Sequence, residues 1–240
     1  MTDQNRDAID YWIRNSAQSG RLRSVVSIYL KIVVWRGVLL ATYGLKRTLD
    51  VCGSFLALVC FSPILLITAI LVKSEDGGPI FFKQVRVGYR GREFKMWKFR
   101  SMRVDAEKLK DSLLAQNEVQ GAVMFKMKQD PRVTRIGRFI RKYSIDELPQ
   151  FWNVLIGDMS LVGPRPSVPR EVSEYGVADR LRLLAKPGIT CLWQVSGRSE
   201  INFEGQVKLD VEYIRSRSVW TDIKLLLRTV PAVLLGKGAY

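Results

Sequence analysis

The sequence contains no histidine and only three cysteines among its 240 residues. Without histidine, the protein has no imidazole to act as a general base, a phosphate carrier or a zinc ligand. Acid, base and nucleophile must therefore come from Asp, Glu, Lys, Ser, Tyr or Cys side chains. Cys52 and Cys60 lie in an apolar run and Cys191 stands alone, so the sequence predicts reduced thiols without a disulfide framework or a cysteine metal site.

Acidic residues are scarce as well. The chain has 23 Asp and Glu against 38 Lys and Arg, which gives a net charge of +15 at pH 7. Such a balance favours polyanionic partners: nucleic acid, anionic lipid or phosphorylated small molecules. The length is sufficient for one substantial domain plus an accessory segment.

Charge is absent from residues 51–72, VCGSFLALVCFSPILLITAILV, a run long enough to cross a bilayer. Ser62-Pro63 stands at its midpoint, where a proline removes a backbone donor and bends a helix. Basic residues flank both ends, whereas a spanning helix concentrates them on one side. The run therefore predicts a segment that enters the membrane, breaks at Ser62-Pro63 and returns to the same face. A proline-bent transmembrane helix is the alternative.

The preceding apolar segment, residues 24–44, is interrupted by Lys31 and Arg36. This pattern predicts an interfacial helix whose basic side chains reach the lipid headgroups. A short second membrane pass is the competing interpretation.

Two basic segments follow the apolar run. Residues 79–100 mix aromatic, β-branched and basic residues on either side of Gly88-Tyr89-Arg90-Gly91, which predicts a two-stranded β-hairpin. Its basic and aromatic side chains suit a solvated face, single-stranded nucleic acid, an anionic headgroup or a nucleotide. Residues 130–144 place four apolar side chains on one helical face and the basic ones off it, which predicts a helix on the membrane surface.

Asp146 and Glu147 follow that basic segment directly. Ser144 and Glu147 have the spacing of a capping box, and Asp146 could itself cap a helix that has Pro149 in its first turn. The same two carboxylates beside an arginine cluster could instead hold Mg²⁺ and phosphate oxygens, or attack phosphorus. Nearby, prolines on both sides of Arg165 restrict its backbone, which suits either a pre-positioned phosphate ligand or a plain tight turn.

From residue 46 onward the chain resembles the bacterial sugar transferases, monotopic enzymes that transfer a sugar-1-phosphate to a polyprenol phosphate. Each shared motif is weak alone, but their order and spacing are specific. The motifs are KRTLD (46–50), Ser62-Pro63, KFRSM (98–102), DPRVTRIGRFIRKYSIDELPQFWNVLIGDMSLVGPRP (130–166), KPGIT (186–190), LWQVSGRS (192–199) and LDVEY (209–213).

The resemblance implies a phosphoglycosyl transferase with Asp146 and Glu147 as its catalytic dyad. Asp146 would attack the β-phosphate of a UDP-sugar, release UMP and carry the sugar phosphate as an aspartyl ester until undecaprenyl phosphate accepts it. Mg²⁺ is the implied cofactor, with Asp146 as its ligand. The implied phosphate or nucleotide contacts are Lys98, Arg100, Gln150 and Arg165.

The fold implied by the resemblance is a mostly helical α/β monotopic membrane protein whose catalytic domain carries a small β-hairpin. The expected domains are residues 1–45, a polar segment with an interfacial helix; 46–73, a re-entrant helix broken at Ser62 and Pro63; and 74–240, the catalytic domain. Lys46 and Arg47 would contact headgroups. The expected location is the bacterial inner membrane, with the catalytic domain on its cytoplasmic face.

The implied partners are a UDP-sugar, undecaprenyl phosphate and inner-membrane lipids, with no nucleic acid, in a pathway such as exopolysaccharide assembly. The sequence identifies neither the sugar nor the oligomeric state, and homo-oligomer formation stays open. Cys191 departs from the family pattern, which has glycine at that position, so the loop 186–199 is expected to be reshaped.

Two other interpretations remain at this point. The chain could be a basic membrane-associated or nucleic-acid-binding scaffold without turnover. The dyad could also bind only Mg²⁺ while the lipid phosphate attacks the UDP-sugar directly.

Overall fold

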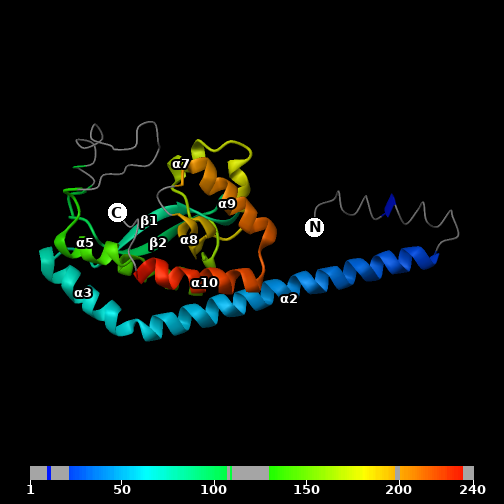
Figure 1. The fold of residues 1–240 in the computed structure, drawn as a ribbon, viewed down its shortest axis with the longest axis horizontal. Coiled ribbons are helices and arrows are strands. Elements are labelled where there is room, and N and C mark those ends of the chain that lie inside the picture. The colour runs from blue at the N-terminus through cyan, green and yellow to red at the C-terminus, as the bar shows by residue number, and fades with distance from the viewer. Residues whose placement is uncertain (1–9, 12–21, 107–108, 110–129, 198–200, 235–240) are drawn as a thin grey trace. The chain divides into compact units, whose positions relative to one another are not determined.

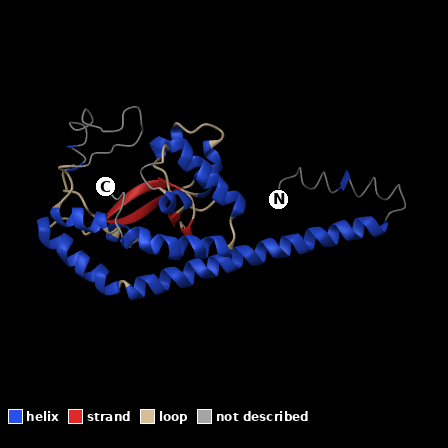
Figure 2. Ribbon diagram, viewed as in Figure 1, coloured by secondary structure: helices blue, strands red, loops and turns tan. Residues whose placement is uncertain are grey.

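The computed structural model describes residues 10–11, 22–106, 109, 130–197 and 201–234. The chain divides into two compact units, Met1–Lys46 and Arg47–Tyr240. The described part is mostly helical with two small sheets, which confirms the predicted balance of helix and strand (Figure 2). The domain boundaries expected at 45/46 and 73/74 stay predictions.

The apolar run forms two helices that meet at a bend (Figure 1): α2 (Leu22–Cys60) and α3 (Ser62–Asp76). The stretch Ser27–Cys60 of α2 has 34 residues, a mean hydropathy of 1.4 and no burial in its apolar window, so by length and composition it is able to cross a membrane. The predicted segment 24–44 is helical. Its position relative to a membrane stays a prediction.

Ser62 and Pro63 produce the bend together. Pro63 has no amide N–H, so the carbonyl of Val59 loses the hydrogen bond that a continuous helix would supply. The hydroxyl of Ser62 donates to this carbonyl at 2.7 Å, and Phe61 leaves the helical conformation with φ −88° and ψ 2°. The predicted break therefore lies where the sequence places it, and the serine compensates for the donor that proline lacks.

The predicted hairpin is confirmed. Strands β1 (Phe81–Val87) and β2 (Glu93–Phe99) pair antiparallel around the short 3-10 turn η1 (Tyr89–Gly91). Arg90 and Gly91 both adopt positive φ there, +57° and +77°. The register pairs Phe82 with Lys98, so that the even-numbered residues of both strands share one face.

Helix α5 (Arg135–Lys142) begins at Thr134, whose hydroxyl accepts from the amide of Gly137 at 2.9 Å. Its apolar side, with Ile136 and Ile140, packs against α3 and β2 at Val72 and Phe99. Because this face is used inside the protein, the interpretation of segment 130–144 as a membrane-surface helix is wrong for it.

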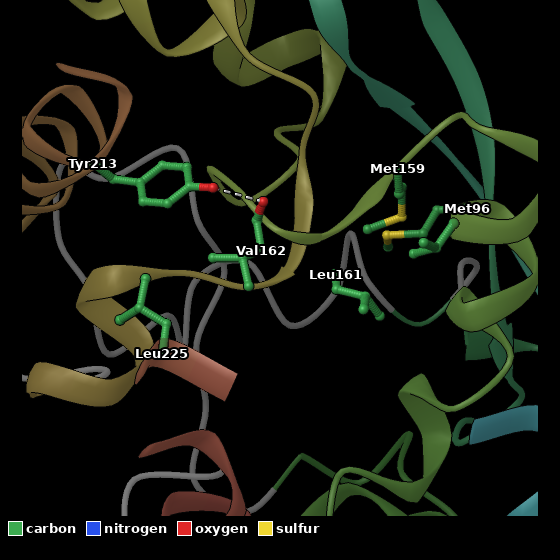
Figure 3. Packing of buried hydrophobic residues seen from close by; sticks show 7 residues of the cluster. Met96, Met159, Leu161, Val162, Tyr213 and Leu225 are labelled. Carbon is green, nitrogen blue, oxygen red and sulfur yellow. Dashed lines mark hydrogen bonds between the residues drawn. The ribbon is translucent and has the colours of Figure 1, made fainter. Parts of the chain in front are cut away.

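The main core lies between β2, α6 (Gln150–Ile156), β3 (Ser160–Val162) and the two C-terminal helices α9 (Phe203–Ser216) and α10 (Val219–Leu234). Figure 3 shows residues of this cluster, in which the Tyr213 hydroxyl donates to the carbonyl of Val162 at 3.0 Å. Strand β3 pairs in parallel with β4 (Gly188–Thr190), a pairing that the sequence analysis did not anticipate. The short elements α7 (Pro169–Ser173) and η4 (Asp179–Leu184) lie between β3 and β4 in the chain, and α8 (Leu192–Ser196) follows β4.

Arg47 and Asp50 attach α2 to this core. The guanidinium of Arg47 donates to the carbonyls of Val154 and Leu155, at the C-terminal end of α6, at 2.7 and 2.8 Å. Asp50 is buried and accepts from the Ser160 hydroxyl and the Leu161 amide, both at 3.0 Å. Arg47 thus satisfies helix-terminal carbonyls, and its predicted contact with a lipid headgroup stays a prediction. The headgroup contact expected of Lys46, in the first unit, stays a prediction.

Candidate active site

Four regions of the sequence line one hollow: the hairpin, the dyad turn with the start of α6, the Pro-Arg-Pro loop and the β4–α8 region. Four of the six polar site residues predicted from the sequence meet there. The full lining is Arg86, Met96, Lys98, Glu147, Gln150, Arg165, Pro166, Gly188, Ile189 and Gln194. Asp146 does not line the hollow but directly precedes Glu147 in the chain. The fold therefore brings the predicted dyad and three of its predicted neighbours together.

The dyad lies in a tight turn. Ser144 adopts a left-handed conformation with φ +55°, and Ile145–Glu147 form the 3-10 turn η3. Among the described residues the Ser144 side chain makes no capping hydrogen bond, and the cap position of α6 is occupied by Pro149. Both capping interpretations are therefore wrong. A non-glycine residue with positive φ immediately before two carboxylates is the kind of backbone strain found at functional sites.

The two carboxylates have different surroundings. Asp146 is 8% exposed, whereas the Glu147 side chain keeps 31% of its surface and lies 2.6 Å from the Lys98 ammonium. Burial raises the pKa of Asp146 to about 6, against the attraction of Lys98 and with the repulsion of Glu147 added. Burial also acts to raise the pKa of Glu147, but Lys98 outweighs it and the pKa of Glu147 is lowered. Two carboxyl groups with pKa values driven apart are typical of an active site.

Close backbone packing positions the loop that carries Arg165. Gly163 and Gly188 approach each other where β3 meets β4: a Cβ added to Gly188 would lie 2.1 Å from the Gly163 nitrogen. The amide of Gly188 donates to the carbonyl of Pro164 at 2.9 Å. Arg165 is exposed, with its guanidinium 5.9 Å from the centre of the Trp193 ring. The prolines and glycines thus hold a basic side chain at the hollow.

Arg100 lies outside this hollow. It is 7% exposed, pairs with Asp76 at the end of α3 and donates to the carbonyl of Pro79 at 2.6 Å. Its partners are therefore protein groups, which assigns it a structural role in holding α3 to the hairpin.

Two polar side chains that line the hollow were not predicted, Arg86 and Gln194. The strand register of the predicted hairpin could have identified Arg86 as a neighbour of Lys98. A turn centred on residue 90 pairs positions whose numbers add up to 180, so Arg86 and Lys98 share a face. Gln194 accepts a hydrogen bond from the buried thiol of Cys191 at 3.1 Å, so that the family departure at Cys191 contacts a lining residue.

The family model described as Bacterial sugar transferase matches residues 41–236. The chain belongs to this family. It is 53% identical over 195 residues to the galactosyl transferase CpsE of Streptococcus agalactiae, covering 81% of this chain and 43% of that protein. It is 45% identical over 199 residues to the UDP-galactose-lipid carrier transferase of Erwinia amylovora, covering 82% of this chain and 42% of that protein.

A shorter family member is also similar, the exopolysaccharide production protein ExoY of Rhizobium meliloti. The identity is 39% over 198 residues, covering 81% of this chain and 88% of that protein. The chain spans less than half the length of the two relatives named first. The family shown by these matches is the one that the motifs resemble.

Proposed function

We propose that the protein is a phosphoglycosyl transferase that moves a sugar-1-phosphate from a UDP-sugar to undecaprenyl phosphate and releases UMP. The observation that carries the proposal is the hollow in which Lys98, Gln150 and Arg165 surround Glu147, with Asp146 buried beside it. Cationic and amide donors around two carboxylates suit a reaction on a diphosphate. Relatives named as UDP-galactose-lipid carrier transferase and undecaprenyl-phosphate galactose phosphotransferase support the same substrates.

In the proposed mechanism a carboxylate oxygen of Asp146 attacks the β-phosphorus of the UDP-sugar. The bond from this phosphorus to the bridging oxygen breaks, and its electron pair leaves with UMP. An oxygen of undecaprenyl phosphate then attacks the aspartyl phosphate, which restores the Asp146 carboxylate. Glu147, kept ionised by Lys98, orients the ammonium group toward the reacting phosphates.

The dyad also fits a magnesium ion. The described residues contain no group of three or more His, Cys, Asp or Glu side chains that could hold a metal. Mg²⁺, however, is commonly held by one or two protein carboxylates together with substrate phosphates. We propose that Asp146 is that protein ligand and that the bound ion neutralises phosphate charge.

The pKa of Asp146 predicts how the rate depends on pH. The nucleophile is the ionised carboxylate, and burial raises its pKa to about 6. At Mg²⁺ concentrations too low to occupy Asp146 in the free enzyme, we therefore expect kcat/KM for the UDP-sugar to rise about tenfold per pH unit below pH 6 and to level off above it. Steady-state rates between pH 5 and 8 in one constant-ionic-strength buffer check this. A flat profile over that range would exclude Asp146 as the titrating group.

The bent helix supports a re-entrant membrane segment. Arg47 and Asp50 attach α2 to the core, and about 14 residues separate this attachment from the bend at Phe61. At 1.5 Å per residue they reach about 21 Å, less than the roughly 30 Å hydrocarbon core. We propose that α2 and α3 enter and leave the same face of a bacterial inner membrane, with the catalytic domain on the cytoplasmic side. Exposed Phe55, Leu66 and Ile70 would contact lipid tails.

The deciding experiment is UMP release by detergent-purified protein with Mg²⁺ and a panel of UDP-sugars, with and without undecaprenyl phosphate. Continued release that requires the lipid would establish the transferase and name its sugar. A phospho-sugar trapped on Asp146 without lipid would support the covalent route over direct attack by the lipid. No release from folded protein, together with salt-dependent nucleic-acid binding, would favour the scaffold.

A further inference from the structure

Arg86 on β1 differs from the other buried arginines of the described chain. Arg100, Arg132 and Arg182 are 5–7% exposed, and each forms an ion pair with an aspartate. Arg86 is equally buried, at 8% exposed, yet it forms no ion pair with a carboxylate of the described residues. Glu171 and Glu147 attract this charge, but neither lies within ion-pair distance of it. A buried guanidinium that no carboxylate contacts is costly and needs an explanation.

Neutral acceptors hold the Arg86 guanidinium in place. Its Nη1 donates to the carbonyl of Pro166 at 2.9 Å, and Nε and Nη2 donate to the Gln84 side-chain oxygen at 3.1 and 2.6 Å. These bonds use three of the five N–H groups and leave one on each terminal nitrogen. Two N–H groups on a fixed planar fork have the geometry that binds phosphate oxygens in pairs.

The charges around Arg86 also favour the binding of an anion. The charged side chains that line the hollow are three cations, Arg86, Lys98 and Arg165, and a single carboxylate, Glu147, which Lys98 already pairs. Burial, and then repulsion by Arg165, lower the pKa of Arg86 to about 10, so the group remains protonated at neutral pH. A ligand with two negative charges would neutralise this excess.

We propose that Arg86 is a substrate-binding residue that binds the diphosphate of the nucleotide sugar through its two remaining N–H groups. The inference rests on the proposed function, because it names a further binding residue of the same site. The Pro166 carbonyl and Gln84 orient the guanidinium before the substrate arrives, and Arg165, which precedes Pro166, lines the same hollow.

The test compares Arg86→Met with two controls. Arg92→Met removes the same charge from the exposed hairpin turn, and Arg100→Met removes a buried arginine that has a structural ion pair. The binding of UDP and of inorganic pyrophosphate, each with Mg²⁺, is measured by titration, and the thermal unfolding midpoint is measured with and without each ligand.

We expect Arg86→Met to weaken UDP and pyrophosphate binding at least about 30-fold and to abolish the ligand-induced rise in midpoint. Its midpoint without ligand should equal or exceed that of the wild type, because a buried charge that no carboxylate contacts is gone. Arg92→Met should bind as the wild type does. Arg100→Met should lower the midpoint and retain the ligand-induced rise.

Three results would overturn the inference. They are unchanged ligand binding in Arg86→Met, a fall in midpoint with the ligand response intact, and a wild type that binds neither ligand. Because these readouts need no turnover, they are independent of the proposed function. A wild type that binds pyrophosphate through Arg86 but never releases UMP would support the site and reject the transferase. In an active enzyme, Arg86→Met should raise KM for the UDP-sugar and leave KM for the lipid unchanged.

Discussion

Asp146→Asn is expected to reduce UMP release by at least about 1,000-fold, because the amide cannot serve as the nucleophile toward phosphorus. The measurement is the steady-state rate with saturating UDP-sugar and lipid. Glu147→Gln is the neighbouring control: it keeps the nucleophile but removes the partner of Lys98, so the loss should be smaller. Full turnover by Asp146→Asn would reject the covalent mechanism.

The same substitution should not destabilise the fold at neutral pH. The pKa of Asp146 is raised from 3.8 to about 6, so the folded protein holds this proton more tightly than the unfolded chain. The cost of burying the ionised group is therefore absent below pH 3.8 and fully present above about pH 6. Asp146→Asn removes a cost on the order of 2–3 kcal/mol at pH 8 and little at pH 4. Denaturant unfolding at the two pH values measures this stability and shows whether a loss of activity in Asp146→Asn is due to a loss of folded protein.

Arg182→Met is expected to lower the free energy of unfolding by about 3–5 kcal/mol, because it leaves a buried carboxylate without its counter-charge. Arg182 and Asp210 are 5% and 0% exposed, and the Arg182 Nη2 lies 2.6 Å from the Asp210 carboxylate. Arg182 also donates to the Tyr175 hydroxyl at 3.1 Å, which is hydrogen-bonded to Ser167 beside the Pro-Arg-Pro loop. Urea unfolding of detergent-purified protein at pH 8 gives the measurement.

Arg180→Met is the matched control, since Arg180 lies two residues away on the exposed side of the same 3-10 segment. Its effect should stay within about 0.5 kcal/mol.

Burial already raises the pKa of Asp210 to about 6, and loss of Arg182 should raise this pKa further. The destabilisation by Arg182→Met should therefore shrink as the pH falls to 5. A loss below about 1 kcal/mol at pH 8 would contradict the assigned role of the pair.

Local chemistry explains what the sequence predicted correctly. The bend follows from the missing donor of Pro63, and the hairpin follows from Gly88 and Gly91 between two β-prone segments. The grouping of Lys98, Glu147, Gln150 and Arg165 was predictable only through the resemblance to a family. Glu147 and Gln150 are close in sequence, but no local signal shows that Lys98 and Arg165 meet them.

Contacts between distant segments explain what the sequence left out. Strands β3 and β4 have three residues each, too short for an alternating pattern to be recognised. In the sequence, nothing distinguishes Arg100 and Arg47 from the other basic residues near the apolar run. Only the fold shows that Arg100 pairs with Asp76 and that Arg47 donates hydrogen bonds to carbonyls at the end of α6. The apolar face predicted for α5 is present, but it packs against α3 and β2 of the same protein.

The bent helix is held at both ends. Arg47 and Asp50 hold the arm before the bend, while beyond it Asp76 pairs with Arg100, and Glu75 accepts from the Arg135 amide at 2.8 Å. Straightening the helix at Phe61 would have to break one of these attachments and expose the packing of Val72. Local opening of this segment therefore costs nearly as much as opening of the domain. The helical segment from Arg47 to Asp76 is therefore expected to unfold together with the domain to which both of its ends are attached.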